Sequence, residues 1–440
     1  MSASSTPLTL VSSAPRERGA FAATLHALLL DLRPILTTLR RHKIAAGLIV
    51  LEVALTCTIV TNALHLIQTR VDALGADSGM AEAGMAVLQV RYSKALPPER
   101  GAGVAAEDMA RLRALPGILA ATTANQIAYA YNSNNSGVRL QPGPKAERLL
   151  VAAQYAGDDH LLATFGLKLI EGRNFLPEEV LDANKVFSVE EPRIGQVILS
   201  KATADKLFPG RSALGQSIYV FGDAPSVVIG VVEKLSHPFV SRGRGDGGAN
   251  SDEYTSIIFP LRGAGFYVIR TDPAQLAAQI KAATAALEAA DTGRVVTQSN
   301  PLAEMRAKFY AQDRAMAWLM GGVCVALLLV TAMGIVGLAS FWVQQRTRMI
   351  GTRRALGATE GQIRRYFQLE NLLLTTTGIV IGLAGAVALS QLLMQSYEVP
   401  RLPWGYLPAG AVSLWLLGQV AVWVPARRAA RLSPVAALRS

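Results

Sequence analysis

Few residues in this sequence could carry out chemistry. The five histidines are isolated from one another, and no Gly-Lys pair is present that could form the phosphate-binding loop of an ATPase. Gly-x-Ser-x-Gly, His-Glu-x-x-His and Cys-x-x-Cys motifs are also absent. One cluster, Asp158-Asp159-His160, could hold a metal ion or exchange protons, but we favour a solvated helix start before LLATFGLKL. The residues therefore give no support for an enzyme active site in this chain.

The pattern that best indicates a function is the basic segment 344–370, QQRTRMIGTRRALGATEGQIRRYFQLE. Its six arginines and two glutamates give a charge of +4. Arginines beside a membrane span can serve only to orient it. That role does not explain the apolar residues among them, which are Met349, Ile350, Ala355 and Leu356. An apolar ridge flanked by arginines on a short helix is typical of a docking element for another protein.

Glycines and a capping pattern divide this basic segment. We expect Gly351, Gly357 and Gly361 to break it into short helical turns. Thr359 and Gln362 have the spacing of a capping box, which predicts that a helix begins there and runs into the next apolar stretch.

Four apolar stretches reach the ~20 residues that a helix needs to cross a bilayer. They are residues 44–66, 318–343, 372–394 and 406–424, the last bounded by Pro425. Hydrophobic residues make up 51% of the chain and charged residues 17%, against roughly a quarter charged in soluble domains. The composition therefore predicts a multi-pass membrane protein.

The net charge of +11 is concentrated next to the apolar stretches. Residues 1–43, the 344–371 loop and the 425–440 tail each carry about +4, while the charges between the first two spans nearly cancel. A nucleic-acid-binding protein would spread its basic residues over a folded face. The positive-inside rule instead places both termini and the 344–371 loop in the cytoplasm, with residues 67–317 and the 395–405 loop outside.

The N-terminal segment is expected to remain cytoplasmic, because it lacks the apolar core and cleavage site of a signal peptide. Within it, Phe21–Arg40 has apolar residues at helical spacing, interrupted by Asp31, Arg33 and Pro34. We interpret this stretch as an amphipathic helix on the inner leaflet. The alternative is that it extends the first span into the cytoplasm.

The outer segment, residues 67–317, alternates helical and strand patterns with glycine and proline, which predicts an α+β domain of two subdomains. Ile257–Pro260 and Gly265–Arg270 are expected to pair as strands, and a helix is expected to begin at Asp272-Pro273. Both cysteines, Cys57 and Cys324, lie in predicted spans, so this domain would fold without disulfides.

Several segments together resemble FtsX/MacB-type ABC-transporter permeases. RMIGTRRALGATEGQIRRYFQLENLLLTTTGIVIGLAGA and the tail PARRAARLSPVAALRS are similar to the cytoplasmic loop, third span and C-terminus of that family. VILSKATADKLFPGRSALGQSIYV, VVIGVVEKL and FGLKLIEGRNF resemble the MacB-like periplasmic core domain. The resemblance covers nearly the whole chain from about Leu39. It implies four transmembrane α-helices with a large α+β periplasmic domain inserted between the first two, which continue outward as stalk helices near Ile67–Leu74 and Glu304–Arg314.

The resemblance also implies partners. Two permeases, identical or paralogous, would pair above two ABC ATPase subunits, which would bind ATP and magnesium. A separate ATPase chain is expected because only about 43 residues precede the first span and they carry no nucleotide motif. The coupling helix resembles Arg348–Ala358 and would enter a groove on the ATPase. Its contact residues would be Arg348, Met349, Ile350, Arg353, Arg354, Ala355, Leu356 and Gly357.

Two polar residues fall inside the first span. A charge at the centre of a span costs roughly 2.5–3.5 kcal/mol on insertion scales, so Glu52 requires a partner or a proton. It either senses closure, at the interface between permeases or between the first two spans, or only makes a packing hydrogen bond. Asn62 is a milder case. In the third span, the small residues Gly378, Gly382 and Gly385 favour close helix packing over ordinary glycine tolerance.

The function that we favour from the sequence is mechanotransmission in tripartite efflux of peptides, antibiotics or similar amphiphiles. That function requires a periplasmic adaptor and an outer-membrane channel. One alternative is a lipoprotein-extraction permease of the LolC/LolE kind, and another is an FtsX-like scaffold that regulates a cell-wall hydrolase. A membrane-bound enzyme is disfavoured because no catalytic constellation is present.

Overall fold

The computed structural model describes residues 35, 37, 42–92, 98–143, 145–238, 254–263, 266–290, 293–397 and 402–431. They form two compact units. The helical unit includes the described residues up to Gln68 and from Ala317 onward, and the sheet unit is Thr69–Met316. The predicted amphipathic helix at Phe21–Arg40 lies outside the described residues apart from Ile35 and Thr37.

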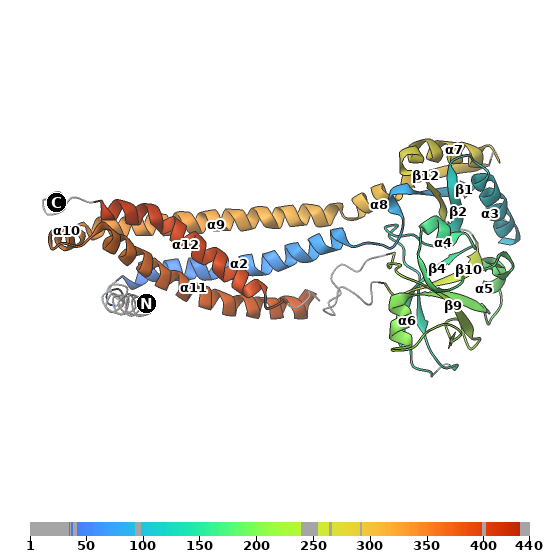
Figure 1. Ribbon diagram of the computed structural model, residues 1–440, viewed down its shortest axis with the longest axis horizontal. Helices are drawn as coiled ribbons and strands as arrows, with labels where there is room; N and C mark the ends of the chain where they lie inside the picture. Colours follow the sequence, from blue (N-terminus) through green and yellow to red (C-terminus); the bar gives the residue numbers. More distant parts are fainter. Residues whose placement is uncertain are drawn as a thin grey trace, which may run out of the picture. The chain divides into compact units, whose positions relative to one another are not determined.

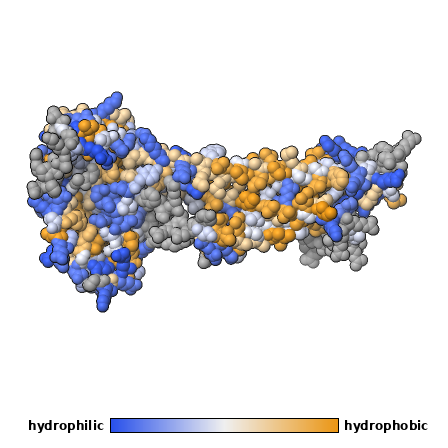
Figure 2. Space-filling view, turned by 180° about the vertical axis from the view of Figure 1, so that it is seen from behind, coloured by the Kyte–Doolittle hydropathy of each residue, from blue (hydrophilic) through white to orange (hydrophobic). Residues whose placement is uncertain are grey.

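By length and composition, four of the described helices can cross a membrane. They are α2 (Lys43–Gly75), α9 (Ala311–Gln345), α11 (Glu360–Tyr397) and α12 (Tyr406–Ala430) (Figure 1). Each contains one of the four predicted spans. Figure 2 shows a continuous band of hydrophobic side chains over this unit, with hydrophilic side chains gathered at the end that carries the short helix α10 (Thr347–Ala355). Such a band is the surface that a helix bundle presents to lipid.

Helix α12 does not end at Pro425, as we expected, but continues through it to Ala430. Proline removes one backbone hydrogen bond and usually kinks or ends a helix. Here the next turn is retained because Ala426, Ala429 and Ala430 are buried in an apolar cluster with α10 and α11. The packing of that turn therefore outweighs the lost bond.

The small residues of α11 allow close helix packing, as predicted, and the helix that they pack against is α2. A Cβ atom at Gly382 would lie 2.5 Å from Cβ of Cys57, and one at Gly378 would lie 2.8 Å from Cβ of Val53. Both distances are shorter than carbon atoms can approach. The close approach also lets the Thr58 hydroxyl donate a hydrogen bond to the carbonyl of Gly382, over 2.9 Å.

The first sheet of the sheet unit is antiparallel, with the strand order β12-β1-β11-β2. Its strands are β12 (Arg294–Pro301), β1 (Met85–Tyr92), β11 (Phe266–Thr271) and β2 (Ile118–Ala124). Helices α3 (Pro98–Arg113) and α7 (Leu276–Glu288) cover one face and bury Leu88, Met109 and Leu287. As predicted, a helical segment begins at Asp272-Pro273, since the Asp272 side chain caps a 3-10 turn that leads into α7.

The second sheet is mixed, with the order β3-β4-β10-β7-β9-β5. These strands are β3 (Asn135–Val138), β4 (Leu150–Gly157), β10 (Ser256–Arg262), β7 (Gln196–Ser200), β9 (Ser226–Val232) and β5 (Leu169–Gly172). Two short strands extend it, because β6 (Leu181–Asp182) pairs with β10 and β8 (Ser217–Ile218) pairs with β9. Three short helices lie between its strands: α4 (Leu161–Phe165), α5 (Ala183–Phe187) and α6 (Lys201–Leu207).

The predicted pairing of Ile257–Pro260 with Gly265–Arg270 is wrong. The first segment lies in β10, between β4 and β7 of the second sheet, while the second lies in β11, between β1 and β2 of the first. Six consecutive residues of β10 are buried, which is typical of a strand covered on both faces. Ile258 packs into one apolar cluster, and Ile257 and Phe259 pack into another.

The two predicted subdomains correspond to the two sheets, which share one core. Val87 and Val268 of the first sheet belong to the same buried cluster as Tyr155 and Ile258 of the second. The sheet unit is therefore a single compact body.

Candidate functional site

Helix α10 has a defined start and end. It follows Arg346 and ends at Ala355, after which Gly357 adopts φ +95°, a left-handed conformation that suits glycine. The predicted capping box then starts α11: Gln362 N–H donates to the Thr359 hydroxyl over 3.3 Å, and Thr359 N–H donates to Oε1 of Gln362 over 2.9 Å. Of the three glycines, only Gly357 breaks the helices, because Gly351 lies inside α10 and Gly361 inside α11.

One side of this segment is exposed. Leu356 is 84% exposed and Met349 36% exposed, and the neighbouring Arg348, Ala355 and Gly357 are also exposed. We call Arg348, Met349, Ala355 and Leu356 the α10 surface. Its apolar side chains lie among arginines, whose charges are costly in the hydrocarbon core of a membrane. Contact with lipid tails therefore does not account for their exposure.

The other side of α10 faces the neighbouring helices of the same unit. Ile350 is only 2% exposed and packs in a cluster with Val343, Ile363 and Phe367, contrary to our expectation that it faces outward. Helical spacing explains the difference, because Ile350 and its neighbour Met349 point in directions about 100° apart.

The two arginines expected to make polar contacts with a partner also touch this unit. The Arg353 guanidinium lies 4.8 Å from the ring centre of Tyr366. Arg354 donates to the carbonyl of Ala430 over 2.6 Å and lies 3.5 Å from Glu360. Both are half-buried, so they hold α10 against α11 and α12.

The two intramembrane polar residues contact neighbouring helices. Glu52 lies against α9, since a Cβ at Gly334 would be 2.4 Å from its Oε2 atom. Glu52 is thus at the contact between the first two spans, one of the two places that we expected. Asn62 donates to the carbonyls of Thr58, over 2.9 Å, and Ala386, over 3.1 Å, which ties α2 to α11.

In the sheet unit, a group of polar contacts joins the end of α2 to the helix that precedes α9. Oε2 of Glu82 accepts a bond from Arg306 of α8 (Leu302–Phe309) over 2.8 Å. Arg306 also donates to the carbonyls of Leu74, over 2.8 Å, and Ala76, over 2.6 Å, at the end of α2. Oε1 of Glu82 accepts a bond from the Tyr129 hydroxyl over 2.8 Å. We call these contacts the Glu82 junction.

Two tyrosines beside the Glu82 junction have an unusual backbone. Tyr129 has φ 68° and Tyr131 has φ 57°, conformations that bulky residues rarely adopt. Their rings lie 5.6 and 5.1 Å from that of Phe309, the last residue of α8. The segment Glu304–Arg314, expected to form a stalk helix, is interrupted directly afterward, because Tyr310 separates α8 from α9. Burial raises the pKa of the Tyr129 hydroxyl well above its usual range, and the hydrogen bond to the Glu82 carboxylate raises it further.

Sequence reasoning did not identify the Glu82 junction. Arg306 lies in the segment expected to form a stalk, but Glu82 is 224 residues away in the sequence. No periodicity or short motif connects residues at that separation.

The Asp158-Asp159-His160 cluster precedes a helix, α4, as predicted, but Asp158 is not solvated. Asp158 is fully buried, forms an ion pair with Arg113 and accepts a hydrogen bond from the Thr122 hydroxyl over 2.8 Å. Its carboxylate can also approach Asp159 and His160 closely enough to share a metal ion. The ion pair already satisfies the charge of Asp158, so these contacts indicate a structural role between α3, β2 and β4.

Two family models match this chain. The MacB-like periplasmic core domain matches residues 50–290, more than half of the 440 residues. The FtsX-like permease C-terminal region matches residues 321–434, which include α10, α11 and α12.

Similar proteins come from several bacteria. The chain is 26% identical to an uncharacterised ABC transporter permease, YknZ, of Bacillus subtilis, over 64% of this chain and 68% of that protein. It is 29% identical to the macrolide export ATP-binding/permease protein MacB of Chromobacterium violaceum, over 62% of this chain and 41% of that protein. It is 26% identical to the pyoverdine export ATP-binding/permease protein PvdT of Pseudomonas entomophila, over 82% of this chain and 52% of that protein. The chain thus matches about half the length of these two ATP-binding/permease proteins.

Solved structures of related domains also align with it. The periplasmic region of MacB from Actinobacillus actinomycetemcomitans aligns with 52% of this chain and 94% of that region, at 16% identity and a TM-score of 0.32. Taken with the family models, the four apolar helices and the inserted two-sheet unit lead to one conclusion. The chain belongs to the ABC-transporter permeases that combine a MacB-like periplasmic core domain with an FtsX-like permease C-terminal region.

Proposed function

We propose that this ABC-transporter permease converts ATP binding and hydrolysis by an ATPase subunit into movement of its sheet unit. The family and the four apolar helices make the chain a multi-pass inner membrane protein. The observation that carries the proposal is that the α10 surface is exposed, while the opposite side of α10 is packed against α11 and α12. ATP and magnesium would be bound by the ATPase subunit.

The α10 surface is suited to transmit force from a partner. Leu356 and Met349 offer apolar contacts, and fully burying one such side chain is worth about 1.5–3 kcal/mol. Ile350, Arg353 and Arg354 hold the same helix against the bundle. A displacement of the partner would therefore move α10 together with α11 and α12 rather than bend it alone.

The route to the sheet unit would run through α2 and α9. Each helix continues from its span into the sheet unit, as α2 extends to Gly75 and α9 begins at Ala311. Within the sheet unit an ion pair between Arg70 and Asp313 joins the two helices. The Glu82 junction then ties the end of α2 to α8.

The proposed arrangement places α10 and both termini in the cytoplasm and the sheet unit in the periplasm. The charge distribution along the sequence supports this orientation. Two permease chains, either identical or paralogous, would pair above two ATPase subunits.

The proposal extends to export of amphiphilic molecules such as peptides and antibiotics. Its support is that two of the relatives are named as macrolide and pyoverdine exporters. A periplasmic adaptor protein and an outer-membrane channel would complete a tripartite assembly.

The test replaces Leu356 with aspartate in the full chain. L356D places a charge where the ATPase would bury an apolar side chain, so we expect affinity for the ATPase subunit to fall on the order of 30-fold or more, as at an interface hot spot. Membrane insertion should be unchanged because Leu356 is exposed. Affinity would be measured with the purified permease in nanodiscs and the ATPase subunit that co-purifies with it.

A matched control separates loss of apolar contact from added charge. T359D places the same charge three residues away, at a helix N-cap that accepts aspartate. We expect T359D to bind the ATPase within about threefold of the unaltered chain, a difference below 1 kcal/mol. If L356D also binds with unchanged affinity, the α10 surface is not the docking site.

A further inference from the structure

A buried ion pair lies where α9 ends and α10 begins. Arg346 is the residue between the two helices, and its Nη1 atom donates to both carboxylate oxygens of Glu370, over 2.9 and 2.8 Å. The exposed fractions of these two side chains are 8% and 2%. Arg346 therefore connects the start of α10 to α11, well inside the protein.

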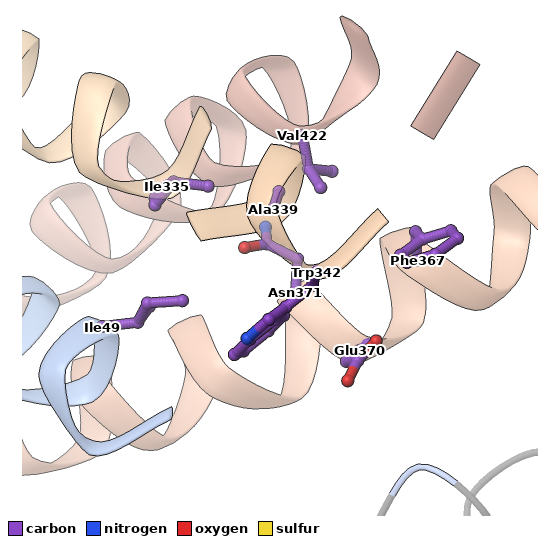
Figure 3. Close-up of a pocket in the computed structure, with 8 residues that line it drawn as sticks. All are labelled: Ile49, Ile335, Ala339, Trp342, Phe367, Glu370, Asn371 and Val422. Atoms are coloured by element: carbon purple, nitrogen blue, oxygen red, sulfur yellow. The ribbon is translucent and has the colours of Figure 1, made fainter. Parts of the chain in front are cut away.

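The surroundings of this ion pair are mostly apolar and not completely filled. A cavity of about 10 Å³ lies between α2, α9, α11 and α12, close to the smallest volume that can hold a water molecule. Figure 3 shows Trp342, Glu370 and Asn371 among the residues around it. Among the described residues, the buried Trp342 Nε1 and Arg346 Nη2 atoms have no hydrogen-bond partner. The Arg346 guanidinium also lies 5.4 Å from the ring centre of Trp342.

The position of the ion pair differs from that of the other arginines near α10. Arg353 and Arg354 hold the body and end of the helix from half-buried positions. Arg346 holds its first turn, and it does so through Glu370, three turns along α11 from Glu360. Asn371, the next residue, donates to the carbonyl of Gly418 in α12 over 2.9 Å. The Arg346–Glu370 pair thus links the junction of α9 and α10 to α11, and the bond from Asn371 links α11 to α12.

We propose that Arg346 and Glu370 are positioning residues for transport, which make the start of α10 move as one body with α11. The inference rests on the proposed function, since it assumes that α10 receives the motion of the ATPase. A bond between two buried charges is directional, so it sets the angle of α10 against α11 as well as their contact. Apolar packing at the same place would preserve the contact but not the angle.

The experiment measures the position of α10 without any ATPase. Spin labels are placed on Thr352 of α10 and Leu372 of α11, which are exposed and lie outside the α10 surface, in the full chain in nanodiscs, with the buried Cys57 and Cys324 checked for lack of labelling. The unaltered pair should give one narrow distance distribution. E370Q and R346M each leave one member unpaired, and we expect the distribution to become at least twice as broad. R346K should remain narrow, because a single charged nitrogen makes both contacts.

The double variant R346M/E370M separates positioning from stability. Replacing a buried ion pair with apolar side chains of similar size commonly leaves a protein as stable as before. We expect its thermal stability to be close to that of the unaltered chain while its distance distribution remains broad. A narrow distribution in R346M/E370M, or in E370Q, would overturn the proposal.

A comparison with L356D distinguishes this inference from the proposed function. L356D should keep the narrow distribution and lose ATPase affinity. R346M/E370M should bind the ATPase and show an ATP-dependent change in the α10–α11 distance, which the unaltered chain should not show because its α10 and α11 move together. If L356D binds the ATPase normally, the docking assignment fails, while the distances still decide whether the ion pair positions α10.

Discussion

At the scale of single residues, a few polar contacts between distant parts of the chain connect α2 and α8 within the sheet unit. Glu82 accepts bonds from both Tyr129 and Arg306, and Arg306 also holds the carbonyls at the end of α2. Tyr129 and Tyr131 maintain left-handed backbones, which cost on the order of 1–3 kcal/mol each. Such a cost persists only where surrounding contacts fix the conformation, which is consistent with a place that must transmit movement.

The first prediction concerns the proton of Tyr129. Its pKa is raised above the ~10 of an ordinary tyrosine, chiefly by burial, so the folded chain binds this proton more tightly than the unfolded chain. The resulting stabilisation is present below about pH 10 and is lost as the pH rises above that value. Tyrosinate absorbance should therefore titrate alike in the unaltered chain and in Y129F up to about pH 11, with all other tyrosines retained.

The same variant tests the hydrogen bond to Glu82. Y129F removes a bond to a charged acceptor, worth about 1.5–3 kcal/mol, and should lower the free energy of unfolding by that amount at pH 7. A titration step near pH 10 that disappears in Y129F would show that Tyr129 is accessible to water and does not form this junction.

At the scale of elements, the positions of the membrane-spanning helices could be predicted from the sequence, whereas the pairing of the strands could not. Apolar length alone located the four spans, and Thr359 with Gln362 located the start of α11. The strand segments at Ile257–Pro260 and within Gly265–Arg270 were also recognised, yet β10 and β11, which contain them, belong to different sheets. Pairing depends on contacts between distant segments, which local patterns do not contain. The inward direction of Ile350 was missed for a similar reason, because the cluster that buries it is assembled from α9, α11 and α12.

The close packing of α2 and α11 gives a prediction at this scale. G382V would place a side chain against Cys57 and Ala54, where a Cβ atom already lies 2.5 Å from Cβ of Cys57. We expect a loss of at least about 1–3 kcal/mol, the usual cost of overpacking. Thermal unfolding in detergent would show it as a lower melting temperature.

Gly321 of α9 provides a matched control for this variant, because no atom lies within 4 Å of a Cβ built there. G321V introduces the same side chain in another apolar helix and should leave the melting temperature within a few degrees. Equal melting temperatures for G382V and the unaltered chain would contradict the described α2–α11 contact.

At the scale of the whole molecule, two continuous helices, α2 and α9, join the two units. The sequence predicted the order of spans and the inserted domain because hydropathy, charge and family motifs are written along the chain. It did not predict the Arg346–Glu370 pair or the Glu82 junction, since each joins residues on different elements. These unpredicted contacts lie where helices end or begin, the places at which force on a helix must pass to its neighbour.

The most direct test of the account asks whether α10 and the sheet unit lie on opposite sides of the membrane. Single cysteines would replace the exposed residues Leu356, in the α10 surface, and Leu119, in strand β2, while the two native cysteines are buried. Spheroplasts would then be treated with a membrane-impermeant maleimide. We predict that L119C is labelled in intact spheroplasts and that L356C is labelled only after permeabilisation. Labelling of L356C in intact spheroplasts, or protection of L119C, would contradict the claim that this permease carries motion from a cytoplasmic ATPase to a periplasmic domain.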